Sequence, residues 1–187
     1  MATEPPAGLA LVMEFENTLD LESGIDELGT PAALAGWLAG RALVDAGLVL
    51  DEGELVRVRE FREAVRALLL ANNGEPADPA ATATLNRVAA SARLRVGFGA
   101  DGRAELRPAA DGVDRALAAL LAAITGAVAD GSWPRLKACH NRDCRWAFYD
   151  RSKNRSGTWC TMAECGNRAK ARAYRARDRR ARSPIPD

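Results

Sequence analysis

The chain has 187 residues, of which 48% are hydrophobic and 27% are charged. This composition is typical of globular proteins and excludes a mostly disordered or collagen-like chain. The formal net charge of +1 conceals two opposite segments, because residues 1–134 carry 11 basic and 20 acidic side chains, whereas residues 135–187 carry 15 basic and 5 acidic ones. All four cysteines and the single histidine lie in the basic segment. We therefore predict an acidic domain over 1–133 and a basic module over 134–187.

The start of the chain shows no basic region followed by an apolar segment, as a secretory signal would. No apolar run approaches the roughly 20 residues that a membrane span requires. We therefore expect a cytoplasmic protein that does not enter a membrane.

The predicted elements of the acidic domain begin with a short strand over the apolar run Leu9–Phe15, which ends at the turn Asn17-Thr18. Thr30-Pro31 provides an N-cap and a first helical residue, and this pattern predicts a helix to about residue 46. Asp51 then caps a longer helix that ends at the sequence Asn72-Asn73-Gly74.

Three further elements follow in the acidic domain. Asp78-Pro79 begins a helix, and the segment 93–107 predicts a β-hairpin around Gly99–Gly102. The alanine- and leucine-rich segment 111–128 predicts a final helix. The sequence thus indicates an α+β fold, mainly helical in the amino-terminal domain, with a small antiparallel β element and a small zinc-binding module that ends in a basic helix.

The acidic domain shows no catalytic pattern, because it lacks histidine, cysteine, a glycine-rich phosphate loop and a suggestive carboxylate pair. We therefore predict that the protein is not an enzyme. The charged stretch Arg57–Glu63 is interpreted as a solvated helix face rather than a site for a buried anion. Asn17 and Thr18 form a possible ligand pocket, although hydrogen bonds within a turn are the favoured interpretation.

The cysteines have the spacing C-x4-C-x15-C-x4-C at Cys139, Cys144, Cys160 and Cys165. Two close pairs of thiolates are typical of one tetrahedral structural zinc ion (Zn²⁺), which leaves no open position for catalysis. Disulfides are disfavoured in a reducing compartment, and an iron–sulfur cluster remains a less favoured alternative. His140 is expected to lie beside the metal site or on the surface rather than to bind the metal.

The segment between the cysteine pairs combines aromatic and basic residues. We expect Trp146, Phe148 and Trp159 to pack around the metal turns, with Trp146 and Phe148 in a short strand. Basic and small polar residues alternate in the loop that follows, which suits a phosphate-binding surface. The predicted basic contacts of this segment are Arg145, Arg151, Lys153 and Arg155.

The module resembles the CGNR zinc-finger family, whose name is the tetrapeptide found here at Cys165–Arg168. Gly157 and Thr158 depart from the family pattern, which usually has basic residues there. The other positions that carry the resemblance are Cys139, Cys144, Trp146, Phe148, Asp150, Ser152, Asn154, Ser156, Trp159, Cys160 and Met162.

The segment from Leu11 to Asp20 resembles the opening of the ABATE domain, which often precedes the CGNR module. Glu16 departs from this pattern, since an apolar residue is usual there. The two resemblances imply a regulator of transcription, associated with a ligand or stress response, in which the zinc module contacts DNA.

The chain after Asn167 is rich in alanine and arginine, which predicts a helix to about Arg182. Five arginines spaced three and four apart share one face, and such a stripe favours a polyanion. A solvated helix without a partner and an anionic membrane surface are the less favoured alternatives. The stripe consists of Arg168, Arg172, Arg175, Arg179 and Arg182.

The zinc and arginine patterns predict a module that binds duplex DNA, and the two resemblances imply that the protein is a bacterial transcription regulator. Its amino-terminal domain would sense a small-molecule effector or form a homodimer. The alternative is a zinc-dependent interaction adaptor that binds RNA, by base stacking on exposed aromatic rings, or an acidic protein partner.

Overall fold

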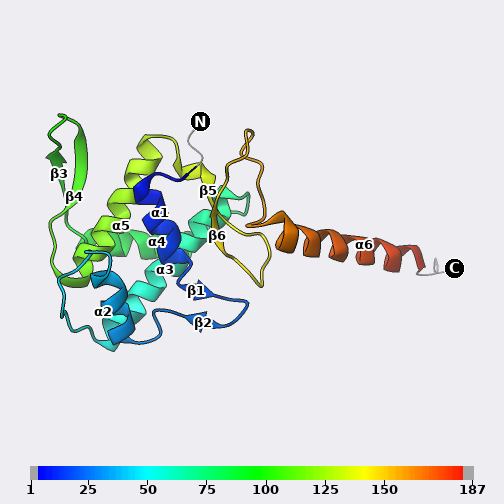
Figure 1. Ribbon diagram of the computed structural model, residues 1–187, viewed down its shortest axis with the longest axis horizontal. Coiled ribbons are helices and arrows are strands. Elements are labelled where there is room, and N and C mark those ends of the chain that lie inside the picture. Colours follow the sequence, from blue (N-terminus) through cyan, green and yellow to red (C-terminus); the bar gives the residue numbers. More distant parts are fainter. Residues whose placement is uncertain (1–3, 183–187) are drawn as a thin grey trace.

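The computed structural model describes residues 4–182, with side chains described up to Asp178. Figure 1 shows a rounded body from which one long helix, α6 (Asn167–Arg182), projects. The other elements, in chain order, are α1 (Ala7–Glu16), β1 (Leu19–Asp20), β2 (Ile25–Asp26), α2 (Pro31–Ala39), α3 (Glu52–Asn72), α4 (Pro79–Ser91), β3 (Leu94–Phe98), β4 (Ala104–Pro108), α5 (Gly112–Ala129), η1 (Trp133–Arg135), β5 (Leu136–Ala138), β6 (Ala147–Tyr149) and η2 (Met162–Gly166).

The first element is a helix, so the predicted strand is wrong. α1 buries Leu9, Val12, Phe15 and Glu16, which recur three and one residues apart along one helical face. An apolar run of this length fits a strand or a helix equally well, and only its packing decides between them. α1 packs against α3, α5 and β6, which gives a helix three surfaces on which to bury its apolar side chains.

The next two helices begin where their caps predict. The Thr30 side chain accepts a hydrogen bond at the start of α2, and Asp51 and Glu54 form a reciprocal capping box at the start of α3. α2 ends at Ala39 rather than near residue 46, because the chain turns after it and Ala42 adopts a left-handed φ of 55°.

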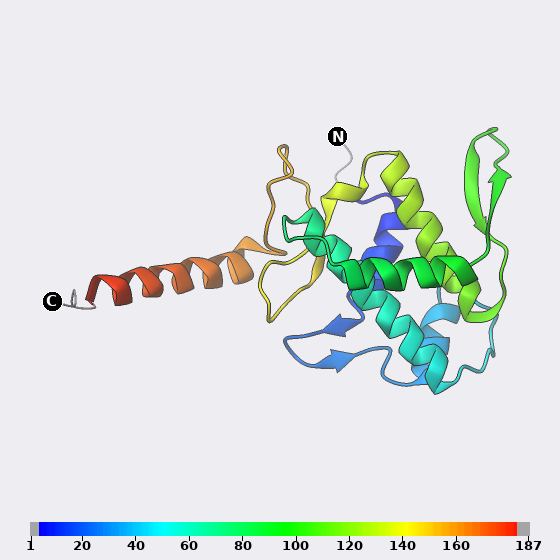
Figure 2. The ribbon, with the colours of Figure 1, turned by 180° about the vertical axis from the view of Figure 1, so that it is seen from behind.

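The remaining elements of the body also follow the predictions. α4 begins at Pro79, capped by Asp78, and Figure 2 shows it lying across α3. β3 and β4 form the predicted antiparallel hairpin, with Leu94 opposite Pro108. α5 contacts this hairpin as well as α1 and α4.

One hydrophobic core extends from the body into the carboxy-terminal module. Leu136, Ala138 and Ala147, on β5 and β6, are at most 1% exposed and belong to the same cluster as Phe15 and Phe61. β5 packs against α3, and β6 packs against α1. The module therefore has apolar support from the body in addition to its cysteine site.

The structure confirms the predicted fold class: a mainly helical α+β body with small antiparallel sheets, followed by the four-cysteine segment and a terminal helix. α5 is the one described helix whose length and hydropathy would allow a membrane span. Core helices commonly share these properties, and the buried side chains Val113, Leu117 and Leu120 are those of a core helix.

Candidate metal centre and basic surface

The first cysteine pair lies on the turn that joins β5 to β6. The amide of Cys139 donates to the carbonyl oxygen of Trp146 at 2.9 Å, which closes the base of the turn. The amide of Cys144 donates to the carbonyl oxygen of Asn141, also at 2.9 Å. Arg145 then adopts a left-handed φ of 51°, which directs the chain into β6.

The second cysteine pair brackets the turn that leads into α6. The hydroxyl of Thr161 accepts a hydrogen bond from the amide of Glu164, and the helical turn η2 follows at once. Gly166 is packed closely, since a Cβ at this position would lie 2.7 Å from the Met162 sulfur. The side chain of Asn167 donates to the Ala163 carbonyl and ties the first turn of α6 to η2.

The four sulfur atoms gather at one point. They lie within 4.8 Å of one another, and the Cys144–Cys160 and Cys160–Cys165 sulfur pairs are each separated by 3.7 Å. A tetrahedral zinc ion with Zn–S bonds of about 2.3 Å requires sulfur separations of about 3.8 Å. The donor set and its spacing therefore fit one zinc ion held by Cys139, Cys144, Cys160 and Cys165.

Burial makes the charged thiolates of Cys144 and Cys160 unfavourable unless a cation accompanies them. Burial raises the pKa of the Cys144 thiol to about 12 and also raises that of Cys160, so both would be protonated at neutral pH without a cation. A zinc ion replaces these protons and binds the thiolates. The amide of the buried Asn141 lies 3.7 Å from the Cys165 sulfur and supports it as a hydrogen-bond donor.

Asparagine side chains of the body hold the two cysteine turns. Asn17, directly after α1, exchanges two hydrogen bonds with the backbone of Ala147, at 3.0 and 2.7 Å. At the end of α3, Asn73 donates to the carbonyl oxygens of Ala138 and Thr158, and Asn72 donates to two carbonyl oxygens near β5. The module is thus fixed to the body beside the metal ligands.

Arg145 contributes to the same contact. Its guanidinium lies 2.6 Å from the Glu75 carboxylate, and its side chain is only 15% exposed. Arg66, from α3, donates to the carbonyl oxygens of Glu16 and Arg145. We therefore correct the prediction for Arg145 and leave it out of the basic surface, because its charge is paired inside the contact between the body and the module.

A buried ion pair shapes the loop that follows β6. The Lys137 ammonium lies 2.8 Å from the Asp150 carboxylate and also donates to the carbonyl oxygens of Arg155 and Gly157. Although burial raises the pKa of Asp150, hydrogen bonds from Lys137, Ser152 and Gly157 lower it to about 2. This pair anchors both ends of the loop, on which Arg151, Lys153 and Arg155 are exposed.

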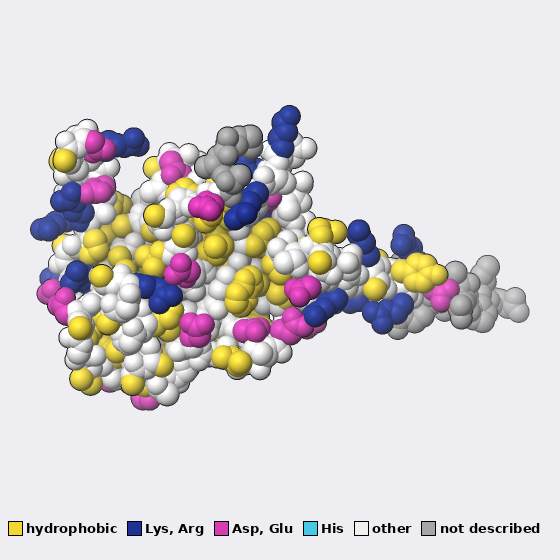
Figure 3. Space-filling view, viewed as in Figure 1, with side chains coloured by type: hydrophobic (Ala, Val, Ile, Leu, Met, Phe, Trp, Pro, Cys, Tyr) yellow, Lys and Arg dark blue, Asp and Glu magenta, His cyan; other side chains and the backbone are white. Residues whose placement is uncertain are grey.

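The arginine stripe begins close to the metal and runs away from the body. Arg168 pairs with Glu22 in the β1–β2 turn, and Arg172 donates to the Asn141 side chain at 3.2 Å. Both arginines and Arg175 are exposed, and Figure 3 shows Lys and Arg side chains along the projecting helix. The side chains of Arg179 and Arg182 lie outside the described residues.

The two residues of the predicted ligand pocket, Asn17 and Thr18, have different environments in the structure. Thr18 is buried and not part of a pocket, since its hydroxyl donates to the Phe15 carbonyl and accepts from Arg62. The turn interpretation is thereby confirmed for Thr18, whereas Asn17 lines a groove beside the module.

The interpretation of Arg57–Glu63 as a solvated face is wrong at one residue. Arg62 is 2% exposed and makes a two-pronged ion pair with Asp26, at 2.7 and 2.8 Å. The anion that Arg62 binds is therefore the partly exposed carboxylate of Asp26 in β2.

His140 is not close enough to join the sulfur cluster. Its ring packs edge-on against Trp159, and its Nε2 lies 3.7 Å from the Glu75 carboxylate. This position agrees with the prediction of a role beside the metal site. Trp159 packs against the cysteines as predicted, whereas Trp146 is 38% exposed and faces the groove.

Several residues of the site were not identified from the sequence, among them Asn73, Glu75, Lys137 and Asn141. Their partners lie up to 85 residues away along the chain, so no local spacing indicates them. Only the adjacent pair Asn72-Asn73, with its tendency to end a helix, gave a signal at this point.

The fold and the site define a four-cysteine zinc-finger protein with a helical amino-terminal domain. The CGNR zinc finger family matches residues 135–178, and the ABATE family, described as “Putative stress-induced transcription regulator”, matches residues 9–131. The second match covers more than half of the chain, so the chain belongs to the ABATE family and carries a CGNR zinc finger. No match was found among curated proteins. The family and the cysteine geometry together identify a site for one structural zinc ion.

Proposed function

We propose that the protein regulates transcription by binding duplex DNA through its zinc-supported basic end. The observation that carries this proposal is the exposure of Arg168, Arg172 and Arg175 on α6, a helix that starts at the metal site and projects from the body. A helix of 16 residues is about 24 Å long, which suits the major groove. The loop with Arg151, Lys153 and Arg155 leaves the same module and supplies a second set of cations for phosphates.

The zinc site serves this function by fixing the direction of α6. Cys165 lies in the last turn of η2, two residues before Asn167 begins α6. Asn141 donates to the Cys165 sulfur and accepts a hydrogen bond from Arg172. This residue therefore links the start of the arginine stripe to the metal site. Four thiolate ligands leave no site for substrate, and the proposed role is that of a cytoplasmic regulator without catalytic activity.

The body has a controlling role in this proposal, either by sensing an effector or by forming a homodimer. Its hydrogen bonds from Asn17 and Asn73 reach Ala147 in β6 and Ala138 in β5 of the zinc module. A change in the body would therefore reach the metal site through a few short contacts rather than through a flexible linker.

The test is a binding titration of the full chain, loaded with zinc, on a labelled duplex of mixed sequence. Changing both Arg172 and Arg175 to Gln keeps unbranched polar side chains of similar helix propensity and removes two charges. We expect weaker binding and a salt dependence reduced by about two counterions. Equal affinity of the parent and this double variant would overturn the assignment to α6.

A matched control removes the same charge at the other end of the molecule. Arg95 and Arg103 are exposed on the β3–β4 hairpin, which Figure 1 shows far from α6. Changing both to Gln should leave DNA affinity almost unchanged. Unaltered zinc content and helical circular dichroism in both double variants would show that lost binding is not lost folding.

The alternative of an adaptor that binds RNA has one observation in its favour, the 38% exposure of Trp146. The carboxylates of Asp20, Glu22 and Glu164 line the same groove and would repel a polyanion. Duplex DNA on α6 is therefore the better supported partner. A single-stranded RNA that displaces the duplex at equal concentration would favour the adaptor instead.

A further inference from the structure

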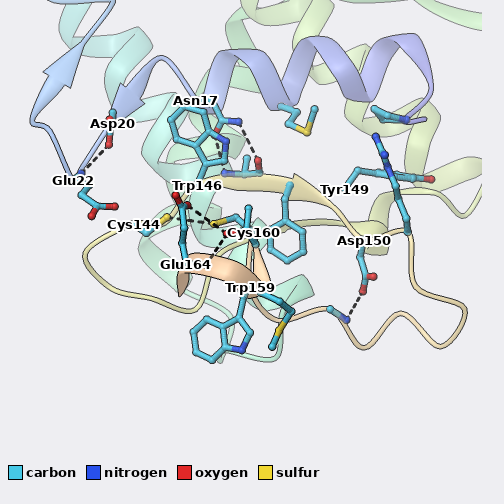
Figure 4. Close-up of a pocket in the computed structure, with 18 residues that line it drawn as sticks. Asn17, Asp20, Glu22, Cys144, Trp146, Tyr149, Asp150, Trp159, Cys160 and Glu164 are labelled. Atoms are coloured by element: carbon cyan, nitrogen blue, oxygen red, sulfur yellow. Dashed lines mark hydrogen bonds between the residues drawn. The ribbon is translucent and has the colours of Figure 1, made fainter. Parts of the chain in front are cut away.

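A groove of about 690 Å³ lies between the zinc module and the segment of the body from α1 to the β1–β2 turn. Figure 4 shows residues of both sides around it, with Asn17, Asp20 and Glu22 from the body. The groove has the volume of a typical small-molecule site, which is about 300–1,000 Å³. The groove can therefore hold a small molecule, and the chemistry of the residues that line it indicates which class of ligand fits.

The apolar part of the lining is aromatic. Trp146, Phe148 and Trp159 all contribute to it, and Met13 of α1 adds a flexible thioether. Figure 4 shows Trp146 and Trp159 on either side of Cys160. Aromatic faces carry negative potential and attract cations, and tryptophan does so most strongly.

The polar part of the lining is mainly anionic. Asp20 and Glu22 come from the β1–β2 turn, and Glu164 comes from η2. Hydrogen bonds from Ser23 and from the amide of Glu22 lower the pKa of Asp20, which keeps it ionised at neutral pH. Arg151 is the basic residue among the lining side chains.

The metal site adds to this negative potential. Cys144 and Cys160 form part of the groove wall, and four thiolates around one Zn²⁺ carry a formal net charge of −2. A bound ion and its ligands are often the largest local charge in such a site and act on the groups beside it. Carboxylates, indole faces and the thiolate cluster therefore all favour the same sign of ligand.

We propose that this groove binds an organic cation, an ammonium or guanidinium group carried on a compact apolar body. The aromatic faces would surround the cation, and the carboxylates at the rim would balance its charge. This inference rests on the proposed function, because it supplies the effector that the body of the regulator would sense.

The groove is well placed to influence the basic helix. Glu22 pairs with Arg168, the first arginine of the stripe, so a cation that takes over this carboxylate frees Arg168 for phosphate. Met162 and Glu164 lie in η2, the turn that leads into α6. The expected consequence is a severalfold rise in DNA affinity when the cation is bound.

The test compares choline with its uncharged carbon isostere, 3,3-dimethylbutan-1-ol, on the full chain loaded with zinc. Ligand-detected NMR and tryptophan fluorescence would follow binding without DNA. We expect saturable binding of choline and at least tenfold weaker binding of the alcohol. Equal binding of the two, or no saturation of choline at tens of millimolar, would overturn the proposal.

Variants locate the site. Trp146→Ala removes a half-exposed ring, and Asp20→Asn keeps the turn hydrogen bonds while removing the charge. Each should weaken choline binding severalfold. Phe98→Ala and Glu105→Gln are the matched controls, since both residues are exposed on the β3–β4 hairpin, and they should leave it unchanged.

This outcome is separable from that of the proposed function. Choline binding is read without DNA, and the arginine variants are read without choline, so either result can fail alone. If a single-stranded oligonucleotide rather than choline quenches the Trp146 fluorescence, the groove is a base-stacking site and the cation proposal is wrong.

Discussion

Asp150 and Gly157 show how closely single residues determine the shape of the basic loop. The amide of Gly157 donates to the Asp150 carboxylate at 2.8 Å, and a Cβ at Gly157 would lie 2.8 Å from the same group. The carboxylate cannot move aside easily, because Lys137 and the amide of Ser152 also bind it. Gly157 is therefore packed directly against the carboxylate that shapes the loop.

Replacing Gly157 with Ala should destabilise the protein by about 1–3 kcal/mol, since the new methyl group overlaps a fixed carboxylate. Chemical denaturation of the zinc-loaded chain measures this change. Gly126→Ala is the matched control, because nothing lies within 4 Å of its Cβ on α5, and it should be neutral or stabilising. A Gly157→Ala variant as stable as the parent would show that the loop can shift at little cost.

Glu16 is a second residue with an unusual environment. It is fully buried, its carboxylate oxygens make no hydrogen bond, and Arg66 lies 3.7 Å away. Burial raises the pKa of Glu16 to about 8, against the lowering influence of Arg66. The folded protein therefore binds a proton here that the unfolded chain releases above about pH 4.3.

The contribution of this proton to stability is present at low pH and is lost as the pH rises toward 8. The parent should therefore lose more than about 1 kcal/mol of unfolding free energy between pH 6 and pH 8.5 relative to Glu16→Gln, which mimics the neutral form. Urea denaturation at saturating zinc gives both values. Glu27→Gln, at an exposed acid, should behave as the parent. Parallel pH profiles of the parent and Glu16→Gln would contradict this account.

The residues that the sequence could indicate are those whose partners are close along the chain. The four cysteines were identified because each pair is one turn apart and the pairs share one metal. Asp26 and Arg62 form their ion pair across 36 residues, and Asn17 reaches Ala147 across 130. Such contacts depend on tertiary packing, so no spacing pattern predicts them.

At the scale of elements, capping residues predicted where helices begin. Apolar runs were a poorer guide to whether a segment is a helix or a strand. Asp51, Asp78 and Pro31 placed three helix starts, whereas the run Leu9–Phe15 was assigned to a strand. α1 is helical because α3, α5 and β6 cover the face on which its apolar side chains lie. Short apolar segments depend on such neighbours, and local sequence does not reveal them.

The end of α3 acts as a brace for the metal site. Asn73 donates to Ala138, directly before Cys139, and to Thr158, two residues before Cys160. It therefore joins both cysteine turns to one helix terminus.

Replacing Asn73 with Ala removes its hydrogen bonds to the carbonyl oxygens of Ala138 and Thr158 and should cost about 1–2 kcal/mol. A loss of this size would speed zinc release to a chromogenic chelator by roughly 5- to 30-fold. Asn86→Ala is the matched control, because Asn86 is exposed on α4. Zinc release from Asn73→Ala at the parental rate would show that the brace does not support the metal.

At the scale of the whole molecule, charge and core are distributed differently. Residues 1–134 are acidic and residues 135–187 are basic, yet Leu136 and Ala147 of the basic segment share the core of the acidic body. The cysteine module is therefore built into the body, and α6 extends away from it. DNA bound to α6 and an effector bound in the groove would therefore both contact the zinc module where it packs against the body.

The central claim is that the zinc-supported basic end binds duplex DNA through phosphate contacts. The most direct test measures the affinity of the full chain, loaded with zinc, for a mixed-sequence duplex across a series of salt concentrations. We predict submicromolar binding at low salt and a logarithmic slope that corresponds to several released counterions. The absence of binding at low salt, with zinc retained, would contradict the account and favour a role in protein interaction.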